Sequence, residues 1–201
     1  MKLNLFSQGL RPVAKIIYEK KDQGIQFQVV SLFERVDTSG SHDPGKVVSK
    51  ASLFRLNPVL VSQVLTGSPQ NITFSIPLDE NETIDLDLTR VNIFTPDFRI
   101  QRAGNPSEDI AIPEGLHFRG IIAGDSNSIC AISIFGNEVM GIVSTLQSGN
   151  MVLGKLNGDP DNTHIFYRES DLLIRPSFDC HTEDFPGAYT PFSFSDCRSM
   201  P

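Results

Sequence analysis

The sequence predicts a mainly β protein with antiparallel, meander or sandwich-like sheets and one short helix near residues 58–66. Two observations predict the sheets. Apolar residues alternate with polar ones along several short segments, which is the spacing that gives a strand one buried face. Clusters of Gly, Asn, Asp and Ser divide these segments, and those residue types favour tight turns. One helix-start signal interrupts this pattern.

The first predicted strand covers residues 25–35, IQFQVVSLFER. Ile25, Phe27 and Val29 alternate there with Gln26 and Gln28, which is the period of a strand. The residues that follow, VDTSGSHDPGK, have the composition of a loop.

The helix signal is Asn57 followed by Pro58. An Asn side chain can accept hydrogen bonds from the free amide groups of the first turn, and Pro at the first helical position loses no intrahelical bond. The apolar residues that then fall on one face are Leu60, Val61, Val64 and Leu65, and Gly67 can end the helix. We expect roughly two to three turns packed against a sheet.

A hairpin is predicted after this helix. Alternating apolar residues run from Ile72 to Leu78 and again from Ile84 to Leu88, with the polar residues DENE between them. Val91 and Ile93 then occupy the other parity. A β-bulge near Thr89 and Arg90 is the expected cause of this phase change.

The second half of the chain predicts an antiparallel meander over residues 117–156. Its four short strands are divided by the turns Gly124–Ser128, Phe135–Glu138 and Gln147–Asn150. A fifth strand, residues 164–168, is expected to extend the same sheet. Apolar residues occur at both parities, so we expect one face to be covered and the other to be partly covered.

Residues 102–115, RAGNPSEDIAIPEG, are the most loop-like internal segment. We therefore expect an N-terminal β unit with the short helix over residues 1–101 and the meander over residues 116–175. Residues 176–201 mix Pro, Gly, Ser and aromatic residues without periodicity, which predicts an extended C-terminal connector.

Composition excludes several classes of partner. The 201 residues carry a formal net charge of −7 and the pI is about 5.0, which argues against nucleic acid as a partner. No stretch approaches the roughly 20 apolar residues of a transmembrane helix. The first residues, MKLNLFSQGLRPVAKIIYEKK, do not contain the apolar core of a complete signal peptide.

Catalytic motifs are missing from the sequence. It contains no His-Glu-x-x-His, no nucleophile elbow, no phosphate loop and no Cys-x-x-Cys, so we expect no enzyme activity, no cofactor and no metal site within this chain. The acidic stretch GDPDN, residues 158–162, is predicted to be a turn rather than a calcium site. We expect His42 in a solvated loop, and His117 and His164 on the surface of the sheet.

Three cysteines occur, at Cys130, Cys180 and Cys197. Cys130 lies in an apolar strand and is expected to be a small buried hydrophobe. Cys180 and Cys197 can close one loop as a disulfide, or they can remain free thiols.

The meander also carries a family resemblance. Gly124, Asp125, Ser128, Ala131, Ser133, Gly141 and Ile142, followed by Tyr167–Asp171 (YRESD), resemble the propeptide domain of reprolysin/adamalysin-type zinc metalloproteases, above all the bacterial secreted members. The resemblance implies a non-catalytic, exported module, extracellular or periplasmic, that chaperones and inhibits a zinc metalloprotease catalytic domain in cis or in trans. The zinc would belong to that catalytic domain.

The resemblance also gives Cys180 a role. Its thiolate would be the inhibitory ligand that fills the open position of the partner's zinc, where water must otherwise be activated. His181 is the candidate supporting residue, because a protonated imidazole beside a thiol lowers the thiol pKa. The alternatives for Cys180 are a disulfide with Cys197 or an inert surface thiol. The alternative for the whole chain is a secreted β-rich adhesion or carbohydrate-binding module without a protease partner.

Overall fold

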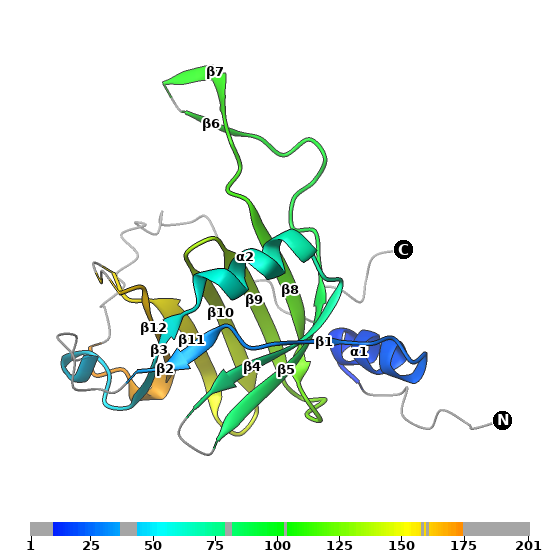
Figure 1. Cartoon of the computed structure of the whole chain (residues 1–201), viewed down its shortest axis with the longest axis vertical. Helices are drawn as coiled ribbons and strands as arrows, with labels where there is room; N and C mark the ends of the chain where they lie inside the picture. Colours follow the sequence, from blue (N-terminus) through cyan, green and yellow to red (C-terminus); the bar gives the residue numbers. More distant parts are fainter. Residues whose placement is uncertain are drawn as a thin grey trace, which may run out of the picture.

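The computed structural model describes residues 10–36, 44–78, 82–102, 104–157, 159 and 161–174. Ten strands form one mostly antiparallel sheet that curls into a half-barrel, in the order β1-β4-β5-β8-β9-β10-β11-β12-β3-β2 (Figure 1). These strands are β1 (Gln28–Val30), β2 (Phe33–Arg35), β3 (Ala51–Leu56), β4 (Asn71–Pro77), β5 (Thr83–Arg90), β8 (Gly115–Ile122), β9 (Ile129–Phe135), β10 (Val139–Thr145), β11 (Gly149–Lys155) and β12 (Thr163–Arg168). The mainly β prediction is confirmed.

The predicted meander is also confirmed. Strands β8, β9, β10 and β11 pair antiparallel in sequence order, and β12 adds to β11. The predicted hairpin is formed by β4 and β5, in which Ile72 lies opposite Leu88 and Ile76 opposite Ile84. The main sheet takes strands from residues 1–101 and from residues 116–175, so both predicted units contribute to it.

Residues 25–36 form a strap across the open side of the half-barrel. The prediction of one strand there is wrong: β1 pairs parallel with β4 at one edge of the sheet, whereas β2 pairs antiparallel with β3 at the other edge. Between them the carbonyl of Leu32 accepts the backbone N–H of Asn57 at 2.9 Å. Within β1, Val29 is 72% exposed and Val30 is buried.

Helix α2 (Pro58–Gly67) begins as predicted, and it packs against the sheet through Val61 and Val64. Asn57 Oδ1 accepts the backbone N–H groups of Val59 at 3.1 Å and Leu60 at 3.2 Å. These two bonds satisfy amide donors that a helix start otherwise leaves free.

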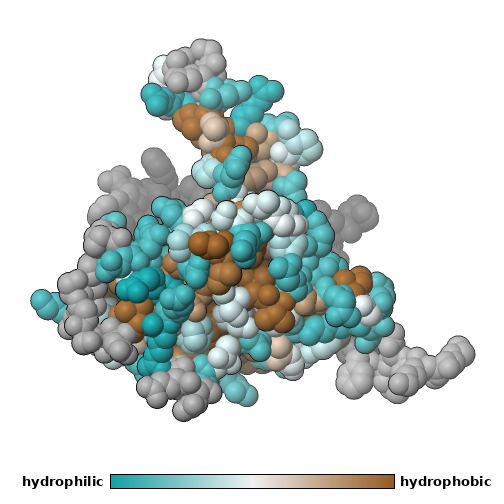
Figure 2. All heavy atoms as spheres, in the orientation of Figure 1, coloured by the Kyte–Doolittle hydropathy of each residue, from teal (hydrophilic) through white to brown (hydrophobic). Residues whose placement is uncertain are grey.

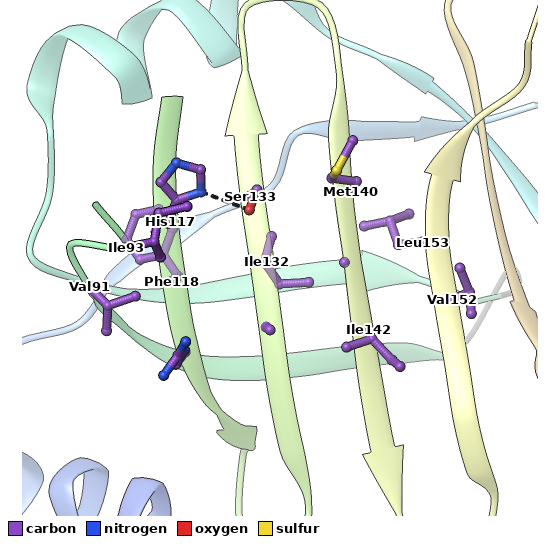
Figure 3. A pocket seen from close by; sticks show the side chains of 13 residues that line it. Val91, Ile93, His117, Phe118, Ile132, Ser133, Met140, Ile142, Val152 and Leu153 are labelled. Carbon is purple, nitrogen blue, oxygen red and sulfur yellow. Dashed lines mark hydrogen bonds between the residues drawn. The ribbon is translucent and has the colours of Figure 1, made fainter. Parts of the chain in front are cut away.

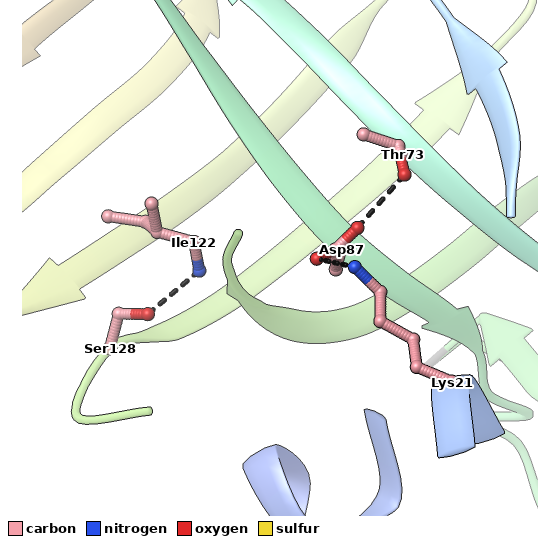
Figure 4. A network of polar contacts seen from close by, with 5 residues as sticks. All are labelled: Lys21, Thr73, Asp87, Ile122 and Ser128. Atoms are coloured by element: carbon pink, nitrogen blue, oxygen red, sulfur yellow. Dashed lines mark hydrogen bonds and ion pairs between the residues drawn. The ribbon is translucent and has the colours of Figure 1, made fainter. Parts of the chain in front are cut away.

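A second helix, α1 (Pro12–Asp22), was not expected from the sequence. Its buried residues, Ala14 and Ile17, pack against Ile121 of β8. Lys21 forms an ion pair with the buried carboxylate of Asp87, which also accepts the hydroxyl of Thr73 at 2.9 Å (Figure 4). The helix therefore attaches to the outside of the sheet by an apolar contact and by an ion pair with a buried carboxylate.

The interval between β5 and β8 differs from the prediction. β5 continues without a bulge to Arg90 and ends there, and Val91 N–H bonds to the carbonyl of His117 at 2.8 Å. Part of the loop-like segment 102–115 is a strand: β6 (Ile100–Arg102) and β7 (Asn105–Ile110) form a separate two-stranded hairpin. Figure 1 shows this hairpin projecting away from the main sheet.

Aromatic and aliphatic side chains fill the inside of the half-barrel. The largest fully buried ones include Phe54, Phe74 and Phe118, and Phe33 of the strap packs its ring against those of Phe54 and Phe74 at centroid distances of 5.3 and 5.9 Å. Two single-turn helices, η1 (Pro44–Lys46) and η2 (Glu169–Asp171), complete the described elements. In the described part of the chain, no helix has the length and apolar character needed to span a membrane.

Candidate functional site

The outer face of the meander carries a groove of about 450 Å³. It lies over β8, β9, β10 and β11, beside the segment that follows β5 (Figure 3). The residues that line it are Val91, Ile93, His117, Phe118, Arg119, Ala131, Ile132, Ser133, Met140, Gly141, Ile142, Val152 and Leu153. Apart from Arg119, His117 and Ser133, this lining offers mainly hydrocarbon and sulfur surface.

Alternation along the strands explains why apolar side chains reach this face. In β10, Val139 and Val143 are buried in the core, so Met140 and Ile142 point to the opposite side, where each is 41% exposed. Ile93, which is 48% exposed, extends the apolar surface beyond β8. Exposed apolar residues that share one concave surface are a feature of interaction sites.

His117 and Ser133 form the polar part of the groove. They are direct partners on β8 and β9, and His117 Nδ1 lies 2.9 Å from Ser133 Oγ. The imidazole also makes edge contacts with the rings of Phe94 and Phe135, at centroid distances of 5.9 and 5.7 Å. Burial lowers the pKa of His117. Its neutral form is therefore favoured in this apolar setting.

The Ser133–His117 pair does not resemble a catalytic site. β9 is an inner strand, so its backbone N–H groups bond to β8 and β10. No pair of free N–H groups is then available beside Ser133 to stabilise an oxyanion, as acyl-transfer chemistry requires. The arrangement is a cross-strand hydrogen bond that orients the imidazole at the rim of the groove.

The meander residues that carry the family resemblance divide into two groups, and Tyr167–Asp171 lies apart from both, at the end of β12 and in η2. Ala131, Ser133, Gly141 and Ile142 all line the groove, although they come from two strands. The other group, Gly124, Asp125 and Ser128, lies in the β8–β9 turn, outside the groove.

Ser128 organises the β8–β9 turn. Its buried hydroxyl accepts the backbone N–H of Ile122 at 2.7 Å (Figure 4). The same hydroxyl donates to the carbonyl of Asp125 at 2.7 Å. Asp125 Oδ1 accepts the N–H of Asn127 at 2.9 Å, and Gly124 has φ +84°. The turn residues of the resemblance therefore fix the connection between β8 and β9, two of the four strands that carry the groove.

His164 contradicts the prediction that it is a sheet-surface residue, because it is completely buried. Its Nε2 accepts the backbone N–H of Val139 at 3.0 Å, and its Nδ1 lies 2.9 Å from the carbonyl of Asn162. An Nδ1–H that donates to this carbonyl leaves Nε2 free to accept, so the neutral imidazole satisfies both contacts. Burial lowers the pKa of His164, in spite of opposing effects from Asn162 and Glu138.

We predict that His164 makes the fold less stable in mild acid. Its folded-state pKa is below the unfolded value of 6.5, so its contribution is complete above pH 6.5 and is lost as the pH falls from there toward the folded-state pKa. Urea unfolding of wild type and His164→Gln at pH 7 and pH 5 measures this effect. We expect the variant, whose amide oxygen can still accept the Val139 N–H, to lose less stability between the two pH values. An equal loss in both proteins would contradict the assignment.

Of the three cysteines, only Cys130 lies in the part of the chain that the structure describes. Cys130 is fully buried, as predicted, and burial raises its thiol pKa to about 12, so it is an unreactive core residue. Cys180, His181, Cys197 and His42 lie outside the described residues. Among the residues that the structure does describe, no three His, Cys, Asp or Glu side chains are grouped so that they could hold a metal ion.

Comparisons with known proteins assign neither a family nor a function to this chain. No model of a known protein family matches this chain, and a search of curated proteins finds no relative. The candidate site therefore depends on the geometry of the groove.

Proposed function

We propose that this chain is a non-catalytic propeptide-type module that chaperones and inhibits a reprolysin-type zinc metalloprotease, in cis or in trans. The observation that supports the proposal best is the position of Ala131, Ser133, Gly141 and Ile142. These residues carry the resemblance to such propeptides, and they line a single groove on the outer face of the meander. The groove is the surface on which the catalytic domain docks.

The composition of the groove suits such a docking surface. Apolar side chains of the catalytic domain can be buried against Met140, Ile142 and Ile93, and burial yields about 25 cal/mol for each Å² of apolar surface. His117 and Ser133 supply a polar contact at the rim. Polar groups at the edge of an apolar contact fix the orientation of a partner more than they add affinity.

Exposed apolar residues also occur on the segment that leads to the projecting hairpin and at the end of β7 in the hairpin itself. Phe98 and Ile110 are 41% and 39% exposed, and Figure 2 shows hydrophobic atoms on this part of the molecule. Phe98 stacks on Phe94, which in turn contacts His117 in the groove. The docking surface can therefore extend from the meander toward the hairpin.

Inhibition follows if the segment after β12 reaches the active site of the docked protease. The N–H of Leu173 still bonds to the carbonyl of Val47 at 2.8 Å, and Cys180 is six residues beyond Ile174, the last described residue before it. Fully extended, six residues span up to roughly 20 Å. A thiolate from Cys180 would fill the open zinc position and exclude the water that the metal activates. His181 beside it would favour the thiolate when protonated.

The test is inhibition of the reprolysin-type zinc metalloprotease of the source organism by the purified chain. We expect the unaltered chain to inhibit, and both Ile142→Asp and Cys180→Ala to raise the inhibition constant at least tenfold, roughly 1.4 kcal/mol. Val29→Asp is the matched control, because Val29 is an exposed apolar residue away from the groove.

Each result has a definite meaning. Inhibition that Ile142→Asp weakens and Cys180→Ala does not would keep the groove as the docking surface and assign inhibition to steric blocking. Failure of the unaltered chain to bind the protease would overturn the proposal. The adhesion or carbohydrate-binding alternative would then be the account to pursue.

A further inference from the structure

The outside of β5 and β8 is covered by an N-terminal arm, residues 12–27, which we call the α1 arm. Of the eleven residues of α1 only Ala14 and Ile17 are buried, and they pack against Ile121 with two partly buried aromatic residues of the arm beside them. This small cluster shares no buried residue with the main core inside the half-barrel. Regions with few buried apolar contacts of their own open at a lower free-energy cost than the core.

Polar contacts of two neighbouring lysines hold the arm in place. Lys20 Nζ donates to Asn71 Oδ1 at 2.7 Å and to Thr89 Oγ1 at 2.5 Å. Lys21 forms its ion pair with Asp87 while its own side chain stays 42% exposed (Figure 4). Both ammonium groups are hydrated again when the arm leaves the sheet, which offsets part of the lost contacts. An isolated helix of this length is not stable in water, so α1 unfolds as it leaves.

The surface under the arm continues the docking groove. Arg119 lines the groove, and Ile121 follows it by two residues in β8, so both face the outside of the sheet. In β9, Ile129 has the same relation to Ala131 of the groove, and it is 39% exposed. The β8–β9 register places the two isoleucines side by side. Ile121 is fully buried, and the residues packed against it belong to the arm.

We propose that the α1 arm is a gate at the end of the groove, which opens as a unit while the half-barrel stays folded. The open form adds Ile121 to the exposed Ile129 and so extends the apolar surface of the groove along β8 and β9. The arm thereby sets how much of the outer face a partner contacts. The identity of that partner rests on the proposed function, whereas the opening itself does not.

The experiment compares two thiols on adjacent strands. Ile121→Cys introduces a thiol beneath the arm, and the native Cys130, fully buried in β9, belongs to the main core. Pulses of N-ethylmaleimide, read by peptide-resolved mass spectrometry, measure each thiol separately. We expect the introduced thiol to be labelled roughly tenfold faster than Cys130 or more, because only global opening exposes Cys130.

Two matched pairs of variants, each made in the Ile121→Cys background, test what holds the arm. Ile17→Ala removes a buried contact of the arm and Ile16→Ala removes a side chain that is 43% exposed. We expect only Ile17→Ala to speed labelling of the introduced thiol, roughly tenfold or more, with Cys130 unchanged. Asp87→Asn removes the partner of Lys21, and Asp85→Asn alters an exposed carboxylate on the same face of β5. Only Asp87→Asn is expected to speed labelling of the introduced thiol.

Equal labelling rates for the introduced thiol and Cys130 would overturn the proposal, because the arm would then open only together with the whole fold. The same conclusion follows if Ile17→Ala speeds the labelling of both thiols alike. Equal effects of Ile17→Ala and Ile16→Ala would show that the buried contact does not hold the arm. None of these measurements contains a protease, so failure of the proposed inhibition would leave their result unchanged.

Discussion

Replacing Phe33 by Ala is expected to lower the free energy of unfolding by about 3–5 kcal/mol. Phe33 belongs to the strap, and its ring packs inside the half-barrel against Phe54, Phe74 and His164 at centroid distances of 5.3, 5.9 and 5.4 Å. Removing the ring leaves a cavity whose aromatic walls cannot collapse onto one another without moving the sheet. The strap is attached at its two ends by only three residue pairs each, with β4 and β3, so packing supplies much of its stability.

Val29→Ala is the matched control for this prediction. Val29 lies in the same strap, only four residues away, but it is 72% exposed. Its truncation is expected to change the stability by no more than about 0.5 kcal/mol. Urea unfolding followed by far-ultraviolet circular dichroism measures both variants. A Phe33→Ala variant as stable as Val29→Ala would show that the strap does not hold the half-barrel together.

Gly120→Ala is expected to cost about 3 kcal/mol or more. A Cβ atom at Gly120 would lie 1.9 Å from the backbone carbonyl oxygen of Asp87 and 2.9 Å from the Cα atom of Leu88. Both atoms belong to the backbone of β5, so no side-chain rotation relieves the contact. β5 and β8 would have to separate next to Asp87, which forms the ion pair with Lys21 of α1.

Gly154→Ala provides the comparison, because a Cβ atom at Gly154 would meet no atom within 4 Å. This variant is expected to change the stability by no more than about 1 kcal/mol. Thermal unfolding of the two variants beside wild type tests the pair. If Gly120→Ala unfolds at the temperature of Gly154→Ala, the close approach of β5 and β8 is not a constraint on the fold.

Local signals explain which elements could be predicted from the sequence. The start of α2 depends on Asn57 and Pro58, and the meander depends on alternation and turn residues such as those around Gly124. These interactions are complete within a few residues, so composition and spacing predict them. The start of α1 had a similar signal, with Pro12 at its first turn and Ala14 and Ile17 three residues apart, and it was missed.

Other features depend on contacts between distant parts of the chain. The strap pairs with β4 and β3 on opposite edges, and no property of residues 25–35 indicates that the segment divides between them. His164 is buried because its ring receives the N–H of Val139, 25 residues earlier. A sequence pattern does not contain these long-range partners. It therefore assigned His164 to the surface.

The groove was predicted only in part. Apolar residues at both parities of the meander predicted a partly covered face, and Met140 and Ile142 are exposed together on it. The sequence did not indicate that Val91 and Ile93 would extend this surface. The segment after β5 is held beside β8 by the bond from the Val91 N–H to the carbonyl of His117, and a local pattern does not reveal a partner so distant in the sequence. The roles of Cys180 and His181 remain predictions.

The most direct test of the account is methionine-methyl NMR of the chain with and without the catalytic domain of a reprolysin-type zinc metalloprotease. Met140 lies in the groove at 41% exposure, and Met151 lies inside the half-barrel at 6%. Docking on the groove predicts that the Met140 methyl signal shifts or broadens in proportion to the complex formed, while the Met151 signal changes little. A complex that leaves the Met140 signal unchanged, or the absence of any complex, would contradict the central claim.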